Sequence, residues 1–189
     1  MRPSIKVALI FVAIWFAVKM AFFKFQLFQD EKGVKILVMW NILCLLLAIS
    51  IGTLLEKRKE NRAESSALGD IKGAMRGGMI YTVLVSTLIY FYYSKIDPSY
   101  NDRQLAVAEA SIRTALDDPK QLAEIKKSPE NESRTKEEIY EKAVENQKAI
   151  YSAGSTMTIS LLGMLLLTTI NAIVVTVVFR RILFKQRTL

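Results

Sequence analysis

The sequence predicts an all-α integral membrane protein with four transmembrane helices and a periplasmic helical hairpin between helices 3 and 4. Three observations lead to this fold class. The apolar residues, 51% of a 189-residue chain, gather into four stretches without a charged side chain. Those stretches are Val7–Val18, Ile36–Leu55, Gly77–Ser94 and Ala149–Phe179. A helix rises about 1.5 Å per residue, so roughly 20 apolar residues cross a bilayer core.

The other two observations concern the charged residues, which fall outside these stretches. The second is that residues 95–148 hold ten basic and 12 acidic side chains. The third is that the segments beside the other stretch ends are mainly basic. We therefore divide the chain into three parts. Residues 1–94 hold helices 1–3 and a basic cytoplasmic loop at 56–76, residues 95–148 form the periplasmic hairpin, and residues 149–189 hold helix 4 and a basic cytoplasmic tail.

The first two spans differ in how clearly the uncharged residues define them. Ile36–Leu55 is the clearest, with 20 uncharged residues. The first span continues beyond its charge-free part to Phe23 and contains Lys19, one turn from the end that Lys24 marks. We expect this long side chain to reach the interface, in preference to the alternative of a buried functional charge. No small-residue cleavage pattern follows Val18, which favours a retained anchor over a cleaved signal peptide. We expect Cys44, inside the second span, to be a small apolar filler.

The third and fourth spans flank the hairpin. Gly77–Ser94 ends in the aromatic run Tyr90–Tyr93, which suits the headgroup level, and Asp97-Pro98 should end its helix. Ala149–Phe179 is 31 residues long, more than a membrane crossing needs. We therefore expect the last helix to begin outside the membrane and to enter it without a break.

The hairpin has recognisable helix signals. An apolar stripe at helical spacing predicts its first arm: Leu105, Ala108, Ile112, Ala115 and Leu116. Asp118 before Pro119 predicts the cap of a second helix, and Thr135 with Glu138 has the form of a capping box at the return arm. The lobe is too short and polar to bury a core of its own. Its stripes must pack on each other, on a second copy, or on a partner.

Basic residues predict the orientation. The segments 1–6, 56–76 and 180–189 carry 12 Lys and Arg in 37 positions, whereas 24–35 and 95–148 carry 13 in 66, with 14 of the 18 acids. Because basic residues remain cytoplasmic, both termini should face the cytoplasm of a bacterial inner membrane. Lys57, Arg58, Lys59 and Arg62 then act either as a topological anchor or as a site for anionic lipid headgroups.

Small and hydroxylated residues in the spans are the candidate contact residues. Such residues let helices approach closely and exchange hydrogen bonds. They serve packing inside one bundle, a subunit interface, or a ligand pathway. The helix-packing or interface candidates are Gly73, Gly77, Thr156, Ser160, Gly163 and Asn171.

The composition argues against catalysis. The chain has no His and one Cys, which removes the commonest general base and the usual metal ligands. The four stretches contain no Asp or Glu, which argues against a proton- or sodium-driven carrier. No aromatic residues interleave the basic cluster, so a nucleic-acid partner is not expected. We predict no enzymatic activity, no catalytic or metal-binding residues and no cofactor.

The order of features resembles a known family. An Ile71–Gly78 entry leads into the third span, and Lys95-Ile96-Asp97-Pro98 then leads to a polar hairpin with a return arm rich in Gln, Glu and Lys. This layout is similar to that of an uncharacterised bacterial family of small four-span inner-membrane proteins, common in Bacteroidota and labelled as a domain of unknown function. The resemblance implies location and architecture and carries over no functional residues.

Two functional hypotheses follow. The first is a non-enzymatic membrane subunit or scaffold that docks through its periplasmic hairpin, as a homo-oligomer or within a larger membrane complex. The alternative is an uncoupled transporter or pore component, in which the Ser, Thr and Asn residues of the fourth span line a polar path.

Overall fold

The fold is all-helical in the part of the chain that the computed structural model describes. That part is residues 1–25, 31–59 and 66–183, without the side chains of 31, 32, 59, 182 and 183. It holds seven α-helices and two short π-helical segments. The chain divides into two compact units, Met1–Leu88 with Ser160–Leu189 and Ile89–Ile159.

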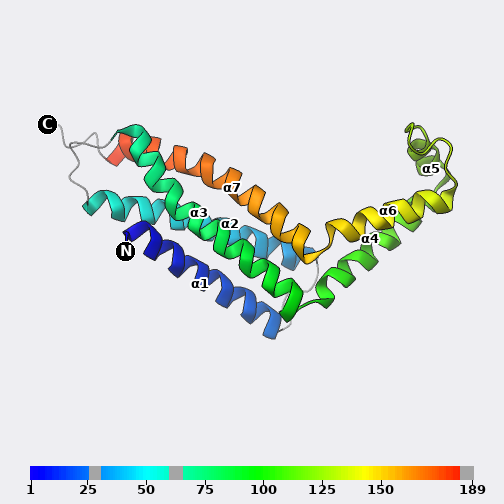
Figure 1. The fold of residues 1–189 in the computed structure, drawn as a ribbon, viewed down its shortest axis with the longest axis horizontal. Coiled ribbons are helices and arrows are strands. Elements are labelled where there is room, and N and C mark those ends of the chain that lie inside the picture. Colours follow the sequence, from blue (N-terminus) through cyan, green and yellow to red (C-terminus); the bar gives the residue numbers. More distant parts are fainter. Residues whose placement is uncertain (26–30, 60–65, 184–189) are drawn as a thin grey trace. The chain divides into compact units, whose positions relative to one another are not determined.

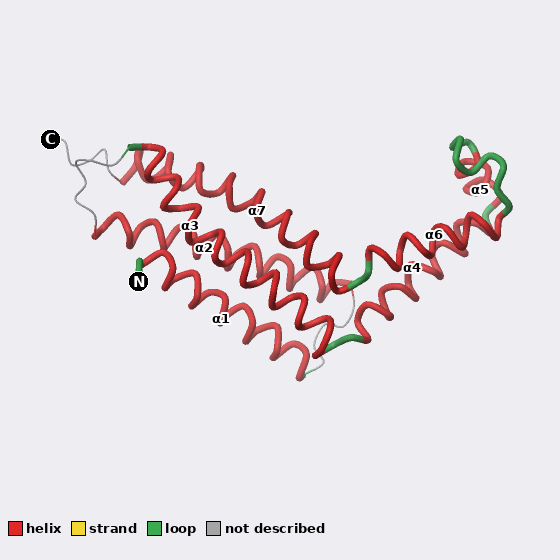
Figure 2. The backbone as a smooth tube through the Cα atoms, in the orientation of Figure 1, coloured by secondary structure: helices red, strands yellow, loops and turns green. Residues whose placement is uncertain are grey.

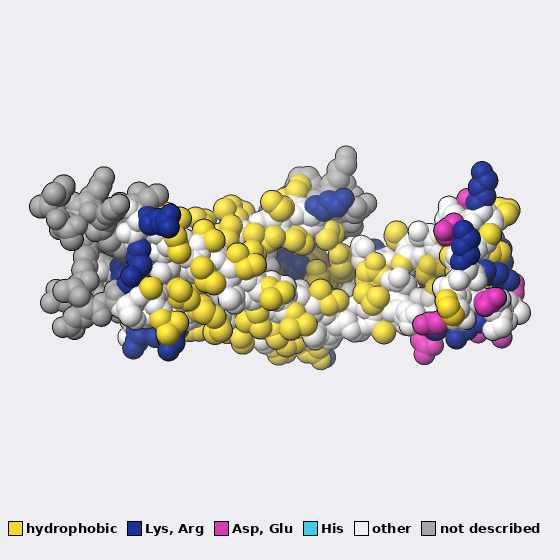
Figure 3. All heavy atoms as spheres, turned by 90° about the horizontal axis from the view of Figure 1, so that it is seen from above, with side chains coloured by type: hydrophobic (Ala, Val, Ile, Leu, Met, Phe, Trp, Pro, Cys, Tyr) yellow, Lys and Arg dark blue, Asp and Glu magenta, His cyan; other side chains and the backbone are white. Residues whose placement is uncertain are grey.

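Four long apolar helices confirm the predicted spans. They are α1 (Pro3–Lys24), α2 (Glu31–Lys59), α3 (Ala67–Phe91) and α7 (Ala153–Val178), shown in Figure 1. Their apolar windows are long enough to cross a bilayer. Hydrophobic side chains cover much of the bundle surface seen in Figure 3. The protein is therefore a multi-pass membrane protein whose outer apolar surface contacts lipid.

Helix α3 is the most deeply buried of the four spans. Inside the structure, 44% of its span is buried, against 22–28% for the other three spans. Tyr81, Thr82, Val85 and Ser86 on α3 are fully buried. Helix α7 instead exposes a long apolar face that includes Leu162 and Leu166.

The segment between the second and third spans is more helical than a basic loop at 56–76 implies. Helix α2 continues to Lys59, and α3 begins at Ala67. Ser66 starts α3, because its Oγ accepts the Gly69 N–H at 3.1 Å and its carbonyl accepts the Asp70 N–H at 3.1 Å. Residues 67–76, which include the charged Asp70, Lys72 and Arg76, thus form the first turns of a membrane helix.

The hairpin predicted between the third and fourth spans is confirmed. After the π-helical segment η1 (Tyr92–Ile96) come α4 (Ser99–Asp117), α5 (Pro119–Lys126) and α6 (Lys136–Ile150). Helices α4 and α6 lie side by side and bury Leu116, Ile139 and Val144 (Figure 1). Of the three covers considered for the apolar stripes, the structure shows the first, in which the two arms cover each other.

Both predicted helix caps of the hairpin are confirmed. Asp118 Oδ1 accepts the Lys120 N–H at 2.9 Å and so caps α5. Thr135 and Glu138 form a complete capping box at the start of α6. These local signals needed no tertiary information to be recognised.

The prediction of an unbroken last helix was wrong. Helix α6 ends at Ile150 and α7 begins at Ala153, with Tyr151 and Ser152 between them (Figure 2). Ser152 causes the break, because its Oγ accepts the Ser155 N–H at 3.1 Å and its carbonyl accepts the Thr156 N–H at 2.9 Å. It therefore acts as the N-cap of a new helix.

Lys19 is more deeply buried than a lysine near a span end is expected to be. Its residue surface is 6% exposed, so the side chain is enclosed by the protein. Lys19 continues the buried face of α1 that includes Ala8, Val12 and Trp15. The three- and four-residue spacing of that face places Lys19 inside the bundle. The second π-helical segment, η2 (Phe179–Leu183), follows α7.

Candidate functional site

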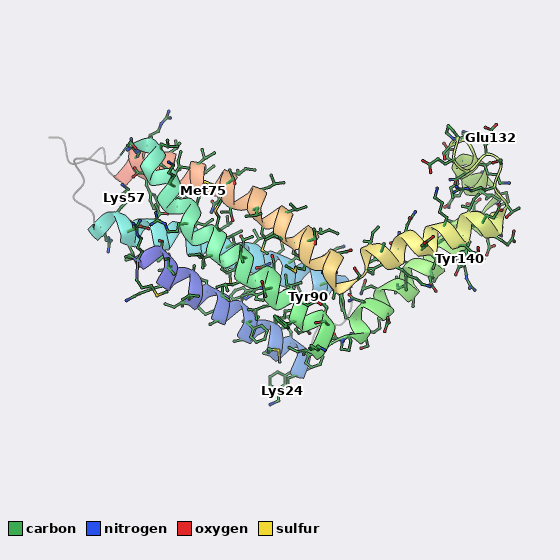
Figure 4. All side chains as sticks on the ribbon, in the orientation of Figure 1. Lys24, Lys57, Met75, Tyr90, Glu132 and Tyr140 are labelled. Atoms are coloured by element: carbon green, nitrogen blue, oxygen red, sulfur yellow. The ribbon has the colours of Figure 1, made fainter. Side chains whose placement is uncertain are left out.

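Charged side chains of α2 and α3 meet Arg2, which precedes α1, and Arg180 of η2 at one end of the bundle. Asp70 on α3 is 5% exposed and holds two cations. Its Oδ1 pairs with the Lys57 ammonium of α2, and its Oδ2 accepts a 2.8 Å hydrogen bond from Arg180 Nε of η2. Figure 4 labels Lys57 on α2 and Met75 on α3 at this end.

A second carboxylate, Glu56 on α2, also holds two cations. Arg76 Nη1 of α3 donates to Glu56 Oε1 at 3.1 Å, and Arg2 Nη1 lies 3.7 Å from the same oxygen. The Glu56 side chain is 11% exposed. We call these two groups the Asp70 trio (Lys57, Asp70, Arg180) and the Glu56 trio (Arg2, Glu56, Arg76). Because each joins three chain segments, together they fix the relative register of the helix ends.

Two glycines bring α1 close enough to complete the Glu56 trio. A Cβ at Gly52 would lie 3.1 Å from Ser4 Cα, and a Cβ at Gly77 would lie 3.3 Å from the Ser4 carbonyl oxygen. Larger residues at either position would push the start of α1 away. Arg2, two residues before Ser4, then lies beside Glu56.

A small pocket lies between the two carboxylates. Its volume of about 20 Å³ holds roughly one water molecule. Glu56 Oε2 is buried and has no hydrogen-bond partner among the described residues. The pocket is lined by Thr53, Glu56, Lys57, Gly69, Asp70, Gly73 and Ala74.

Polar contacts also join the helices further along the bundle. Tyr81 donates its hydroxyl to Asn41 Oδ1 at 2.8 Å, and Asn41 Nδ2 donates to Met164 Sδ at 3.3 Å. The hydroxyls of Thr82 and Thr168 share a 3.1 Å hydrogen bond. These bonds link α2, α3 and α7, and they satisfy polar groups that lipid cannot.

The predicted contact residues occupy different environments. Gly77 faces Ser4, and a Cβ at Gly73 would lie 4.0 Å from Glu56 Oε2. Thr156 donates to the Ser152 carbonyl of its own helix. Ser160 is half-buried, whereas Gly163 is exposed with open space around it. Asn171 is half-buried, and its Nδ2 is buried without a partner in the described part of the chain.

The predicted headgroup residues are also separated from each other. Lys57 is engaged by Asp70 and its side chain is 9% exposed, whereas Arg58 is exposed. The Lys59 side chain and all of Arg62 lie outside the described residues. The sequence argument missed Glu56 and Asp70, although they were detectable as two of the four acids on the strongly basic side.

Outside the spans, polar contacts among its own residues stabilise the hairpin of residues 95–148, which we also call the lobe. Arg103 Nη2 donates to both Asp97 carboxylate oxygens, at 3.2 and 3.1 Å, next to Pro98. Hydrogen bonds from Thr135 lower the pKa of the Glu138 carboxyl, the backbone N–H contributing most. A hydrogen bond from Lys142 likewise lowers the pKa of Glu130.

Figure 4 shows Tyr140 on the return arm of the hairpin. Arg113 on α4 donates from Nε to the Tyr140 hydroxyl at 3.0 Å, and its guanidinium carbon lies 5.1 Å from the ring centroid. Lys136 and Asp117 form a further link between the arms. No group of three or more His, Cys, Asp or Glu in the described ranges converges to hold a metal.

Comparison with known families places the chain. Residues 6–181 match the family described as Protein of unknown function (DUF4199). This range runs from α1 to η2 and includes the four long helices and the lobe. The chain belongs to the DUF4199 family. Comparison of this DUF4199 protein with curated proteins and with solved structures gives no match.

Proposed function

We propose that this DUF4199 protein is a non-enzymatic subunit or scaffold of a bacterial inner membrane, which docks through its periplasmic hairpin on a second copy or in a larger complex. In this proposal both termini face the cytoplasm and the ends rich in Lys and Arg lie at an anionic leaflet. The excess of basic residues in segments 1–6, 56–76 and 180–189 supports that orientation.

The observation that carries the docking proposal is an uncharged face on α4. All five of its residues are exposed and none is charged, whereas other exposed positions of the same helix carry a charge, such as Asp102, Arg103 and Asp117. Val107 is the most prominent, with 67% of its surface exposed. The core of a protein–protein interface is depleted in charged residues, so this uncharged face suits a protein partner. We call it the α4 outer face: Ala106, Val107, Ala110, Ser111 and Thr114.

The hydrogen bonds of α7 support a scaffold more than a pore. The Thr168 hydroxyl is buried against Thr82, and the hydroxyls of Thr158 and Thr169 donate to carbonyls of their own helix. A polar path needs such groups to remain free for a solute or for water. In this bundle they serve contacts within and between helices.

Ala110→Glu tests the docking proposal, because it places a charge at the centre of the α4 outer face. We expect the assembly seen by native mass measurement in detergent to dissociate. Ala123→Glu, at an exposed position on α5, is the matched control and should leave the assembly intact. A wild-type protein that is strictly monomeric, with no co-purifying protein, contradicts the proposal.

A further inference from the structure

The Glu56 trio brings two arginines together over a single carboxylate oxygen. Arg76 and Arg2 both approach Glu56 Oε1 through Nη1, at 3.1 and 3.7 Å. Each guanidinium has further N–H donors beyond the one used here. Since one carboxylate balances only one of the two positive charges, the trio carries a net charge of about +1. The Asp70 trio next to it carries the same excess.

The trio also lies at the edge of the apolar spans. Arg2 precedes the first helix, Glu56 directly follows the charge-free stretch that ends at Leu55, and Arg76 directly precedes the one that begins at Gly77. This is the level at which lipid phosphates lie. The Arg2 and Arg76 side chains are 60% and 35% exposed, so both are accessible there.

We propose that Arg2 and Arg76 bind the phosphate of an anionic phospholipid, with Glu56 holding the two guanidinium groups side by side. Guanidinium groups bind phosphate oxygens through paired hydrogen bonds, and a positive excess favours a negative ligand. A soluble phosphate shares this chemistry. The lipid is favoured because exposed apolar side chains adjoin the site in sequence: Leu55 is 36% exposed and Met79 is 42% exposed.

This site differs from the basic run at residues 57–62 predicted to meet headgroups. Lys57 is held by Asp70, so it is not the residue that presents a cation to lipid. The inference rests on the proposed function only in that an anionic leaflet lies at this end of the bundle. Binding by the detergent-solubilised protein does not depend on orientation, so the two proposals fail independently.

The test titrates the purified full-length protein, in a neutral detergent, with phosphatidylglycerol, phosphatidylcholine or inorganic phosphate, and native mass spectrometry measures occupancy. We expect phosphatidylglycerol to bind most tightly. Arg76→Gln and Arg2→Gln should each weaken its binding about tenfold, the scale of one charge-assisted interaction. Lys72→Gln is the matched control, because Lys72 is exposed on α3 at the same end and belongs to neither trio. It should change the affinity by less than about twofold.

Glu56→Gln gives a result of the opposite sign. The amide oxygen of the new side chain still accepts a hydrogen bond from Arg76 and keeps the guanidinium group in place, whereas the competing negative charge is removed. Phosphatidylglycerol should therefore bind more tightly than to the wild type. If Arg76→Gln does not fold, Arg76→Lys keeps the charge but loses the planar fork, and should bind more weakly than the wild type. Three results would overturn the proposal: equal losses in Lys72→Gln and Arg76→Gln, weaker binding by Glu56→Gln, or inorganic phosphate binding as tightly as the lipid.

Discussion

Gly78 and Gly163 occupy opposite environments on two of the long helices. A Cβ at Gly78 would lie 2.4 Å from Thr168 Cγ2 and 2.8 Å from Ile49 Cδ1, and both of those side chains are buried. A Cβ at Gly163 would meet nothing within 4 Å. The first glycine is required by a close contact between helices, and the second is not required by any contact in the described bundle.

Gly78→Ala should therefore destabilise the bundle by about 2 kcal/mol, because an extra methyl group in a filled core displaces the side chains around it. Gly163→Ala is the matched control and should be neutral or stabilising by up to about 1 kcal/mol, since Ala favours a helix over Gly. Thermal unfolding of both variants in the same detergent measures the difference. Equal stability of the two variants would contradict the close contact at Gly78.

Asp70 is the residue on which one end of the bundle most depends. Asp70→Asn removes the carboxylate that pairs with Lys57, whose side chain is 9% exposed. Removing one partner of a buried ion pair costs about 3–5 kcal/mol, so we expect a large fall in the unfolding temperature. The double variant Asp70→Asn with Lys57→Met removes the buried charge as well, and Arg180, with a 38% exposed side chain, can turn to solvent.

The double variant should accordingly recover most of the stability that the single variant loses. Thermal unfolding of the single and double variants in one detergent measures both effects. An Asp70→Asn protein as stable as the wild type would show that the Asp70 trio does not hold the helix ends together.

Among the elements, α6 begins with a capping box whose stability should depend on pH. The bonds from Thr135 lower the pKa of Glu138 in the folded lobe. A lowered folded pKa stabilises the capping box above the ordinary carboxyl pKa, and the stabilisation is lost as the pH falls through the folded value. Carboxyl chemical shifts should therefore show Glu138 titrating below an ordinary glutamate. Thr135→Val removes only the smaller, hydroxyl contribution and keeps the backbone N–H, so it should move the midpoint upward by part of the shift, whereas Thr135→Ser should not.

Local signals explain which elements could be predicted. The caps at Asp118 and Thr135 are spelled out within four residues, and the charge-free stretches mark the spans directly. The break at Ser152 was not predicted, because no proline or charged residue marks it in the sequence. The Ser152 side chain accepts the hydrogen bond that a helical carbonyl would otherwise accept. An apolar stripe alone does not reveal such a cap.

The candidate site could not be predicted from the sequence, because it depends on contacts between helices. Lys57 follows a membrane span and has the pattern of a topological anchor, and only the approach of Asp70 from another helix changes its role. The same holds for Lys19, whose burial follows from the face on which it lies. Charge near a span end predicts orientation well, but pairing across helices depends on register that no single stretch contains.

For the whole molecule, the central proposal is that the four helices cross the membrane with both termini and residues 56–76 on the cytoplasmic side and residues 95–148 on the other side. Cysteines introduced at Ser66 and Lys126, in a Cys44→Ser background, test it with a membrane-impermeant thiol reagent applied to intact cells and to inverted vesicles. The account predicts that Lys126→Cys reacts in intact cells and Ser66→Cys only in inverted vesicles. Labelling of both positions from the same side would contradict it.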